Sequence, residues 1–277
     1  MTETIYLLRT ADADHRSYGG FQWPSEPGSV VEAPDWDPEP KCMHGLHGYP
    51  RGEGEGRELR ADDPDAIWQV IEAEAEAVVR IPNGDGKAKV PRCTLVYAGD
   101  RETAIALIHE RHPDAAVWGS RVITGDRGVS ISGGYGTSIS GEFGIAVSGI
   151  GGKSISGYSA TSISGNYGMS ISGYGGGSTS GIGGISTSGD LGMSISGYLG
   201  KSASGHHGMS TSGEFGIAAS GIGGRIQIVS WDGRRYRLCV GYVGEDGIEP
   251  DTYYLCRSGR LVRVDPQPEH PTKESTP

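Results

Sequence analysis

The chain has 277 residues and a formal net charge of −10. Its acidity lies in residues 1–124, which hold 22 acidic and 13 basic side chains, whereas residues 125–224 hold 4 and 3. A nearly neutral central segment cannot attract nucleic acid by releasing counterions. Four cysteines are too few for a disulfide scaffold, and no apolar run is long enough to span a membrane. We therefore exclude nucleic acid and membrane as partners and, since no secretory signal is visible, expect a cytoplasmic protein.

Residues 1–117 have the pattern of a small α+β domain. Residues 17–40 are rich in glycine and proline and predict turns. Apolar or alternating runs predict strands at 4–8, 68–74 and 94–97, although the alanine and glutamate content of the second run also suits a helix.

A hairpin and a helix are predicted further along this domain. Residues 77–81 and 87–90 flank Asn83-Gly84-Asp85-Gly86, which is a typical hairpin turn. Residues 101–111 predict a helix that begins after Asp100 as its N-cap and stops before Pro113.

Cys42, His44 and His47 form the sharpest group of chemically active residues. Their spacing suits two or three ligands of a zinc ion. Other residues that could complete the set are Cys93, His109 and His112. Because zinc sites usually show four ligands, we favour a simple turn in which the cysteine is buried and a histidine bonds locally. The sequence thus predicts no cofactor, with an enzyme or metal site around these three residues as an alternative.

Residues 125–224 repeat an eight-residue word, G-x-x-G-x-S-x-S, without insertion. The second glycine is replaced once, by Ala160, and the last serine runs unbroken from Ser132 to Ser220. A fixed register argues against a flexible or disordered linker, and two glycines per word exclude a helix. We predict short x-S-x-S strands stacked as a β-solenoid. The glycines are expected to supply the positive φ angles of the corners.

The number of words per coil stays open from the residues alone. Words that lie three words apart resemble each other, as residues 166–172 and 190–196 do. This similarity fits a triangular coil of three words, or 24 residues. It equally fits a duplicated three-word block within a flat coil of two words, or 16 residues. The word is similar to the octapeptide A-G-Y-G-S-T-x-T of bacterial ice-nucleation proteins, and Gly173-Tyr174-Gly175 keeps its glycine-tyrosine corner. This resemblance implies two words per coil and favours the flat option.

Side chains alternate along a strand, so the two serines of a word share one face. We favour serine inside, because only serine or alanine occupies these positions and because lysine, which is rarely buried, occurs on the other face. The alternative places the isoleucines inside a wider coil, where apolar burial drives folding. With serine inside, the predicted binding face consists of Thr137, Ile139, Lys153, Ile155, Met169, Ile171, Met193, Ile195 and Lys201.

Two hairpins are predicted after the repeat. One joins 226–230 to 236–243 through Asp232-Gly233, and the other joins 252–256 to 260–264. Together they would cap the last coil. The predicted parts of the chain are the α+β domain (1–117), the solenoid (118–225), the β-hairpin cap (226–265) and a disordered tail (266–277).

The three-part layout is similar to bacterial and phage proteins of unknown function. Residues 42–47 match their C-x-x-G-[LF]-H signature, and residues 251–254 resemble a segment of their cap. This resemblance implies the layout but no activity.

The repeat shows no catalytic arrangement. A nucleophilic serine needs a partner base, and no histidine or acid recurs beside the ladder. We therefore expect a non-catalytic structural or protein-binding module that acts on a protein partner or by self-association through exposed isoleucine and methionine rows. The alternative, implied by the resemblance, is an ice-binding or ice-nucleation-like surface.

Overall fold

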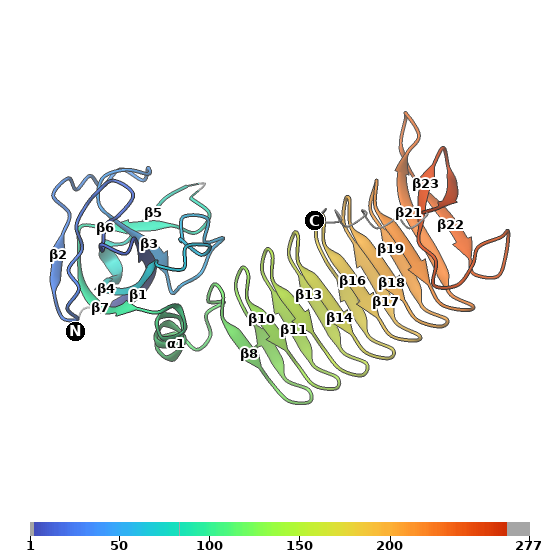
Figure 1. The fold of residues 1–277 in the computed structure, drawn as a ribbon, viewed down its shortest axis with the longest axis horizontal. Helices are drawn as coiled ribbons and strands as arrows, with labels where there is room; N and C mark the ends of the chain where they lie inside the picture. Colours follow the sequence, from blue (N-terminus) through green and yellow to red (C-terminus); the bar gives the residue numbers. More distant parts are fainter. Residues whose placement is uncertain (1–2, 83, 265–277) are drawn as a thin grey trace, which may run out of the picture.

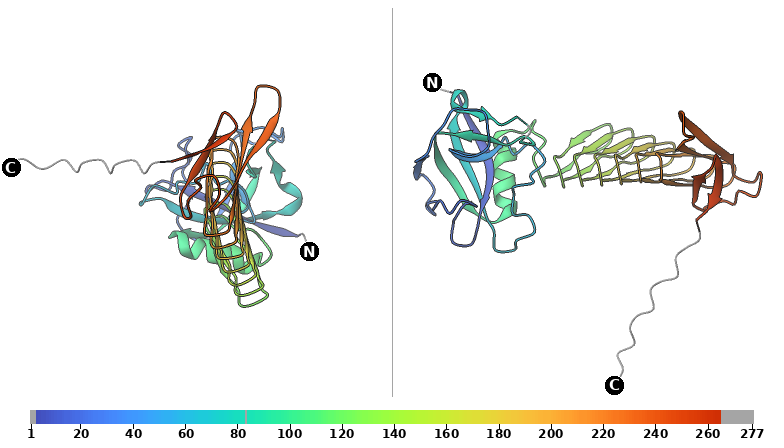
Figure 2. Two further views of the ribbon diagram at one scale, coloured as in Figure 1. Left: turned by 90° about the vertical axis from the view of Figure 1, so that its right-hand side faces the viewer. Right: turned by 90° about the horizontal axis from the view of Figure 1, so that it is seen from above.

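The computed structural model describes residues 3–82 and 84–264. The molecule is elongated (Figures 1 and 2), with an N-terminal sheet domain, a rod of stacked coils and a pair of hairpins following one another along its axis. The fold is mainly β, as predicted, and the described residues contain one α-helix. The predicted tail lies outside the described residues.

The N-terminal domain is built on a 7-stranded antiparallel sheet in the order β2-β7-β4-β1-β3-β6-β5. In β4, Trp68 and Val70 pack into one core cluster, and Ile71 and Ala73 pack into the other. Residues 68–74 therefore form a strand rather than a helix, because alternate side chains are buried on the two faces of the sheet. The bounds are β1 (Thr4–Ala11), β2 (Val30–Glu32), β3 (Leu46–Pro50), β4 (Ile67–Glu74), β5 (Val79–Arg80), β6 (Ala88–Val90) and β7 (Arg92–Gly99).

Helix α1 (Arg101–Arg111) packs on the sheet through Ala104, Ile105 and Ile108. The side chain of Asp100 accepts a hydrogen bond from the Thr103 backbone N–H at 2.8 Å, which confirms the predicted N-cap. This bond, with those from the Tyr97 and Thr103 hydroxyls, lowers the pKa of Asp100 to about 2. Strands β5 and β6 pair as the predicted hairpin requires.

Each coil of the rod contains two words. Thr137 pairs in parallel with Lys153, and Ile145 pairs with Thr161, so each strand lies beside the strand sixteen residues later. Alternate strands thereby form two parallel sheets that face each other. The flat coil is confirmed, and the triangular 24-residue coil is wrong.

The strands of the rod are short. The first sheet contains β8 (Arg121–Ile123), β10 (Thr137–Ile139), β12 (Lys153–Ile155), β14 (Met169–Ser172), β16 (Ile185–Ser188), β18 (Lys201–Ser204) and β20 (Ile217–Ser220). The second contains β9 (Val129–Ile131), β11 (Ile145–Ser148), β13 (Thr161–Ser164), β15 (Gly177–Thr179), β17 (Met193–Ser196), β19 (Met209–Ser212) and β21 (Arg225–Trp231).

The space between the two sheets is filled by serine, as predicted. The ladder serines between Ser130 and Ser220 are 6 % exposed or less. Their hydroxyls join the sheets: Ser170 Oγ on β14 lies 2.9 Å from Ser164 Oγ on β13 and donates to the Thr179 carbonyl oxygen on β15 at 2.6 Å. The alternative with isoleucine inside is wrong, since Ile163 is 40 % exposed. Most of these buried hydroxyls are paired, which makes their burial tolerable, whereas those of Ser140 and Ser202 have no partner among the described residues.

The glycines of the word have a different role from the predicted one. Positive φ falls on the third position of the corner, as at Tyr167 (58°) and Leu199 (56°), and on neither glycine of the word. A Cβ added at Gly168, by contrast, would lie 2.7 Å from Cβ of Ser164. The second glycine therefore allows the close approach of backbone to serine, a position where alanine occurs once, at Ala160, and the prediction that it supplies positive φ is wrong.

Both ends of the rod are covered. Trp118 lies 5.6 Å from Trp68 of the N-terminal sheet and 5.6 Å from Tyr135 of the second corner, measured between ring centroids. At the other end β21 pairs with the antiparallel β22 (Tyr236–Tyr242), and β20 pairs with the antiparallel hairpin of β23 (Tyr254–Arg257) and β24 (Arg260–Arg263). The predicted hairpins are confirmed, and the Cys239–Cys256 disulfide joins them.

Candidate functional site

The rod presents two broad outward surfaces, formed by the fifth and seventh positions of the words. We name them the β8 face, on β8 to β20 of the first sheet, and the β9 face, on β9 to β19 of the second. From β9 to β19 this face carries no charged side chain, and Arg225 of β21 follows Met209 in the next coil. Its residues are Val129, Ile131, Ile145, Val147, Thr161, Ile163, Gly177, Thr179, Met193, Ile195, Met209 and Thr211.

The β8 face differs because cations interrupt it. Arg121, Lys153 and Lys201 occupy its fifth-position column. The Nζ of Lys201 lies 4.1 Å from the centroid of the Tyr253 ring, which belongs to the cap. This face is therefore a mixed apolar and basic surface.

The predicted binding face is divided between these two surfaces. Thr137, Ile139, Lys153, Ile155, Met169, Ile171 and Lys201 lie together on the β8 face. Met193 and Ile195 belong to β17 and lie on the β9 face. A single face containing all of them is wrong, because in a two-word coil successive words alternate between the sheets.

The corners carry two further regularities that sequence reasoning missed. Tyr158 and Tyr174 stack with parallel rings 5.4 Å apart, and Phe143 lies 5.7 Å from Tyr158. Acceptor side chains bond to the next coil, as when Asp190 Oδ1 accepts from the His206 backbone N–H at 2.7 Å. These residues recur at a spacing of sixteen in the sequence. That spacing indicates contacts between neighbouring coils only once the coil is known to contain sixteen residues.

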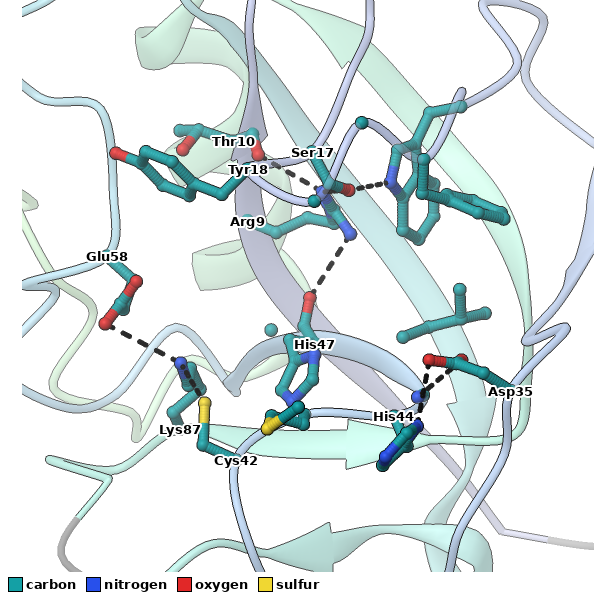
Figure 3. A pocket seen from close by; sticks show the side chains of 18 of the residues that line it. Arg9, Thr10, Ser17, Tyr18, Asp35, Cys42, His44, His47, Glu58 and Lys87 are labelled. Carbon is teal, nitrogen blue, oxygen red and sulfur yellow. Dashed lines mark hydrogen bonds and ion pairs between the residues drawn. The ribbon is translucent and has the colours of Figure 1, made fainter.

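The N-terminal domain contains a cavity of about 750 Å³, shown in Figure 3. Arg9 from β1 and Lys87 beside β6 line it, together with the rings of Phe21 and Trp23. The Arg9 guanidinium lies 3.6 Å from the centroid of the Trp23 ring. Burial lowers the pKa of Arg9 to about 9, so this side chain stays charged at neutral pH.

Cys42, His44 and His47 all line this cavity but do not converge on one point. Cys42 Sγ accepts from Lys87 Nζ at 3.3 Å, and His44 Nδ1 lies 3.2 Å from Asp35 Oδ2. In the part of the chain that the structure describes, no three histidine, cysteine, aspartate or glutamate side chains are grouped to hold a metal ion. The local histidine bond agrees with the turn that we favoured, whereas Cys42 is exposed rather than buried.

The residues considered as a fourth zinc ligand lie elsewhere. Cys93 is buried in the sheet, and this burial raises the pKa of its thiol to about 12. His112 Nε2 accepts from the Tyr6 backbone N–H at 3.4 Å. His109 lies on α1. None of the three lines the cavity.

His47 reports the electrostatic character of the cavity. Its pKa is lowered to about 4, first by burial and then by the positive charges of Lys87, Lys89 and Arg9. Its Nε2 is buried and has no hydrogen-bond partner among the described residues. The imidazole is therefore neutral at pH 7 and lies in a positive potential.

Comparison with known proteins shows a partial similarity to ice nucleation proteins. The chain is 31 % identical over 113 residues to the ice nucleation protein of Xanthomonas campestris pv. translucens. This alignment covers 41 % of the chain and 7 % of that protein. The chain is 30 % identical over 110 residues to the ice nucleation protein of Pseudomonas syringae, and this alignment covers 40 % of the present chain and 9 % of that protein. The chain thus spans less than a tenth of the length of these two curated relatives.

Other comparisons add no family. No family model matches the chain, and no solved structure gives a significant match. Among the described residues, no helix has both the length and the apolar character needed to cross a membrane.

Proposed function

We propose that the protein is a non-catalytic structural or protein-binding module, and that its β9 face binds a second copy of the chain. The observation that carries this proposal is the difference between the two faces. From Val129 to Thr211 the β9 face is uncharged, whereas the β8 face carries Arg121, Lys153 and Lys201. An exposed apolar surface of this kind marks an interaction site.

A second copy suits this face for a physical reason. A two-fold contact places the same patch on both partners, and an uncharged patch meets no like-charge repulsion when it faces itself. The face extends roughly 30 Å along the rod at the usual strand spacing of about 4.8 Å. Strands of three or four residues make the face roughly 12 Å wide at about 3.3 Å per residue. Its area, on the order of 400 Å², is smaller than a standard stable interface of about 800 Å² per partner, so we expect a weak, reversible dimer.

Sedimentation velocity over a range of concentrations tests the proposal. Ile163→Lys places a charge in the middle of the β9 face and should abolish the concentration dependence. Ile155→Lys places the same charge on the β8 face beside Lys153 and should leave it unchanged. A wild-type protein that stays monomeric at millimolar concentration, or equal effects of the two variants, would contradict the proposal.

A second candidate function is an ice-binding surface. It is supported by the similarity to ice nucleation proteins and by a column of β-branched side chains on the β9 face. Ile163, Thr179, Ile195 and Thr211 follow one another in register along this column. Droplet freezing and thermal hysteresis measurements, with Ile163→Lys as the disrupted surface, decide it. No effect of the wild-type protein at high concentration would remove it.

A further inference from the structure

The N-terminal cavity contains a buried cation that lacks a counterion. Arg9 is 7 % exposed. Its Nη2 donates to Ser17 Oγ at 3.1 Å and to the Thr10 carbonyl oxygen at 3.2 Å, and its Nη1 donates to the His47 carbonyl oxygen at 3.4 Å. All of these acceptors are neutral, and Arg9 forms no ion pair among the described residues. Burying a charge without an opposite charge is costly, so this arrangement is unusual.

Two of the five N–H groups of this guanidinium, one on Nε and one on Nη1, have no acceptor among the described residues. Arg9 Nε is buried and has no hydrogen-bond partner within the described ranges. The Trp23 ring fixes the guanidinium from one side, and Trp23 Nε1 donates to the same Ser17 hydroxyl at 2.7 Å. The group is therefore held in a defined orientation with capacity for a further acceptor, which is the preorganisation that anion binding requires.

Neighbouring groups increase the positive charge. Lys89 is fully buried and donates to the Met43 carbonyl oxygen at 3.3 Å. Lys87 is 9 % exposed, and its nearest carboxylate is that of Glu58, at 3.7 Å and largely exposed. Asp35, the other acid of the lining, already pairs with His44. The acids at the cavity therefore leave the charge of Arg9 unbalanced.

We propose that this cavity binds a small organic anion, a carboxylate or phosphate monoester attached to a flat apolar group. Arg9 is assigned to the anionic oxygens, and the positive charge of Lys87, which lines the same cavity and bonds to Cys42 and Glu58 (Figure 3), adds to the attraction. The rings of Tyr18 and Phe21 are assigned to the apolar group. A cavity of about 750 Å³ suits a drug-sized ligand and is far too large for a bare ion. This proposal is independent of the solenoid faces.

Calorimetric titration of the full chain tests the proposal with four probes: phenyl phosphate, benzoate, inorganic phosphate and phenol. We expect phenyl phosphate or benzoate to bind, and the stronger of the two identifies the anionic group. Phenol lacks the anionic group that bonds to Arg9, and inorganic phosphate lacks the aromatic ring that the cavity would bury, so each should bind at least about tenfold more weakly.

Variants locate the site. Arg9→Lys keeps a positive charge but loses the planar donor group and should weaken binding roughly 10- to 100-fold. Lys87→Gln leaves Arg9 in place and should weaken binding several-fold. Its affinity tests the site independently if Arg9→Lys fails to fold. Arg92→Gln removes an exposed charge outside the cavity and should change affinity less than twofold.

Three results would overturn this assignment. They are the absence of binding by both aromatic anions at millimolar concentration, equal binding of phenol, and an Arg92→Gln effect as large as that of Lys87→Gln.

Discussion

The hydroxyl bridges between the two sheets make a quantitative prediction about the stability of the rod. Ser164 and Ser170 share one bond of 2.9 Å, and Ser170 donates a second bond of 2.6 Å to the Thr179 carbonyl oxygen. Because a hydroxyl has one proton, Ser164 must supply the proton of the shared bond when Ser170 donates to the carbonyl. Replacing either serine by alanine therefore breaks a defined set of bonds.

The expected magnitudes follow from counting these bonds at about 1 kcal/mol each. Ser170→Ala removes both bonds and should lower the free energy of unfolding by about 2 kcal/mol. Ser164→Ala removes the shared bond and should cost about 1 kcal/mol. In the double variant the shared bond is lost only once, so the total should fall about 1 kcal/mol short of the sum.

The chain supplies a matched control for this experiment. Ser140 occupies the same position of its word as Ser164 and is equally buried, but its Oγ has no partner among the described residues. The reason is that Ala146 stands where the next word would place a serine. Ser140→Ala should therefore change stability by less than about 0.5 kcal/mol.

Urea unfolding followed by circular dichroism measures these changes, and hydrogen exchange of the amides of β13 and β14 assigns them to the correct coil. The second measurement is needed because repeat proteins do not always unfold as one unit. Full additivity of the two single variants, or a loss in Ser140→Ala equal to that in Ser170→Ala, would refute the bond count.

Further predictions concern single sites. Ala146→Ser should restore the missing bridge and raise the free energy of unfolding by about 1 kcal/mol in urea titrations. Leu199→Gly should also stabilise by about 1 kcal/mol, because Leu199 has positive φ and is largely exposed, whereas Leu199→Ala should give no gain. Removing the Cys239–Cys256 disulfide by paired serine substitutions should destabilise the cap by about 3 kcal/mol, measured by limited proteolysis. The folded protein holds a proton on His47 less tightly than the unfolded chain, so stability should fall as pH drops from about 6.5 toward 4, and an NMR titration of His47 should show a pKa of about 4.

The sequence was sufficient to predict the solenoid and the inward serines, because a strict eight-residue register with a serine-or-alanine limit has few structural solutions. It was insufficient for the coil length. The three-word similarity between residues 166–172 and 190–196 arises between strands of opposite sheets, since three words are one and a half coils. Similar words at this distance therefore do not stack, and the true stacking partners, such as Thr137 and Lys153, look unlike each other.

The glycines show why a correct motif can have a wrong explanation. Glycine suits both positive φ and close backbone approach, and a sequence does not distinguish these two demands. In the structure, bulky residues such as Phe215 have the positive φ, at 59°, while a Cβ on Gly216 would lie 2.1 Å from Oγ of Ser212. The second glycine, which only Ala160 replaces, is therefore the part of the corner that touches the serine ladder.

The cavity could not be found from sequence for a related reason. Arg9, His47 and Lys87 come from separate strands and turns with no common spacing, and each alone is an ordinary polar residue. Only the sheet order, which places β1 beside β3 and β3 beside β6, brings them to one cavity. The group that was visible in the sequence, around Cys42, marks the same place.

The closed ends of the rod determine which of its surfaces remain for partners. At the first coil the backbone N–H of Gly133 donates to the Val117 carbonyl oxygen at 2.9 Å, and Trp118 is buried between Trp68 and Tyr135. At the last coil the strands of the cap run antiparallel to those of the rod. Coil-on-coil pairing with another rod is therefore blocked at both ends. A partner of the solenoid must use its lateral surfaces, and of the two broad faces the β9 face lacks charge from β9 to β19, up to Arg225 of β21.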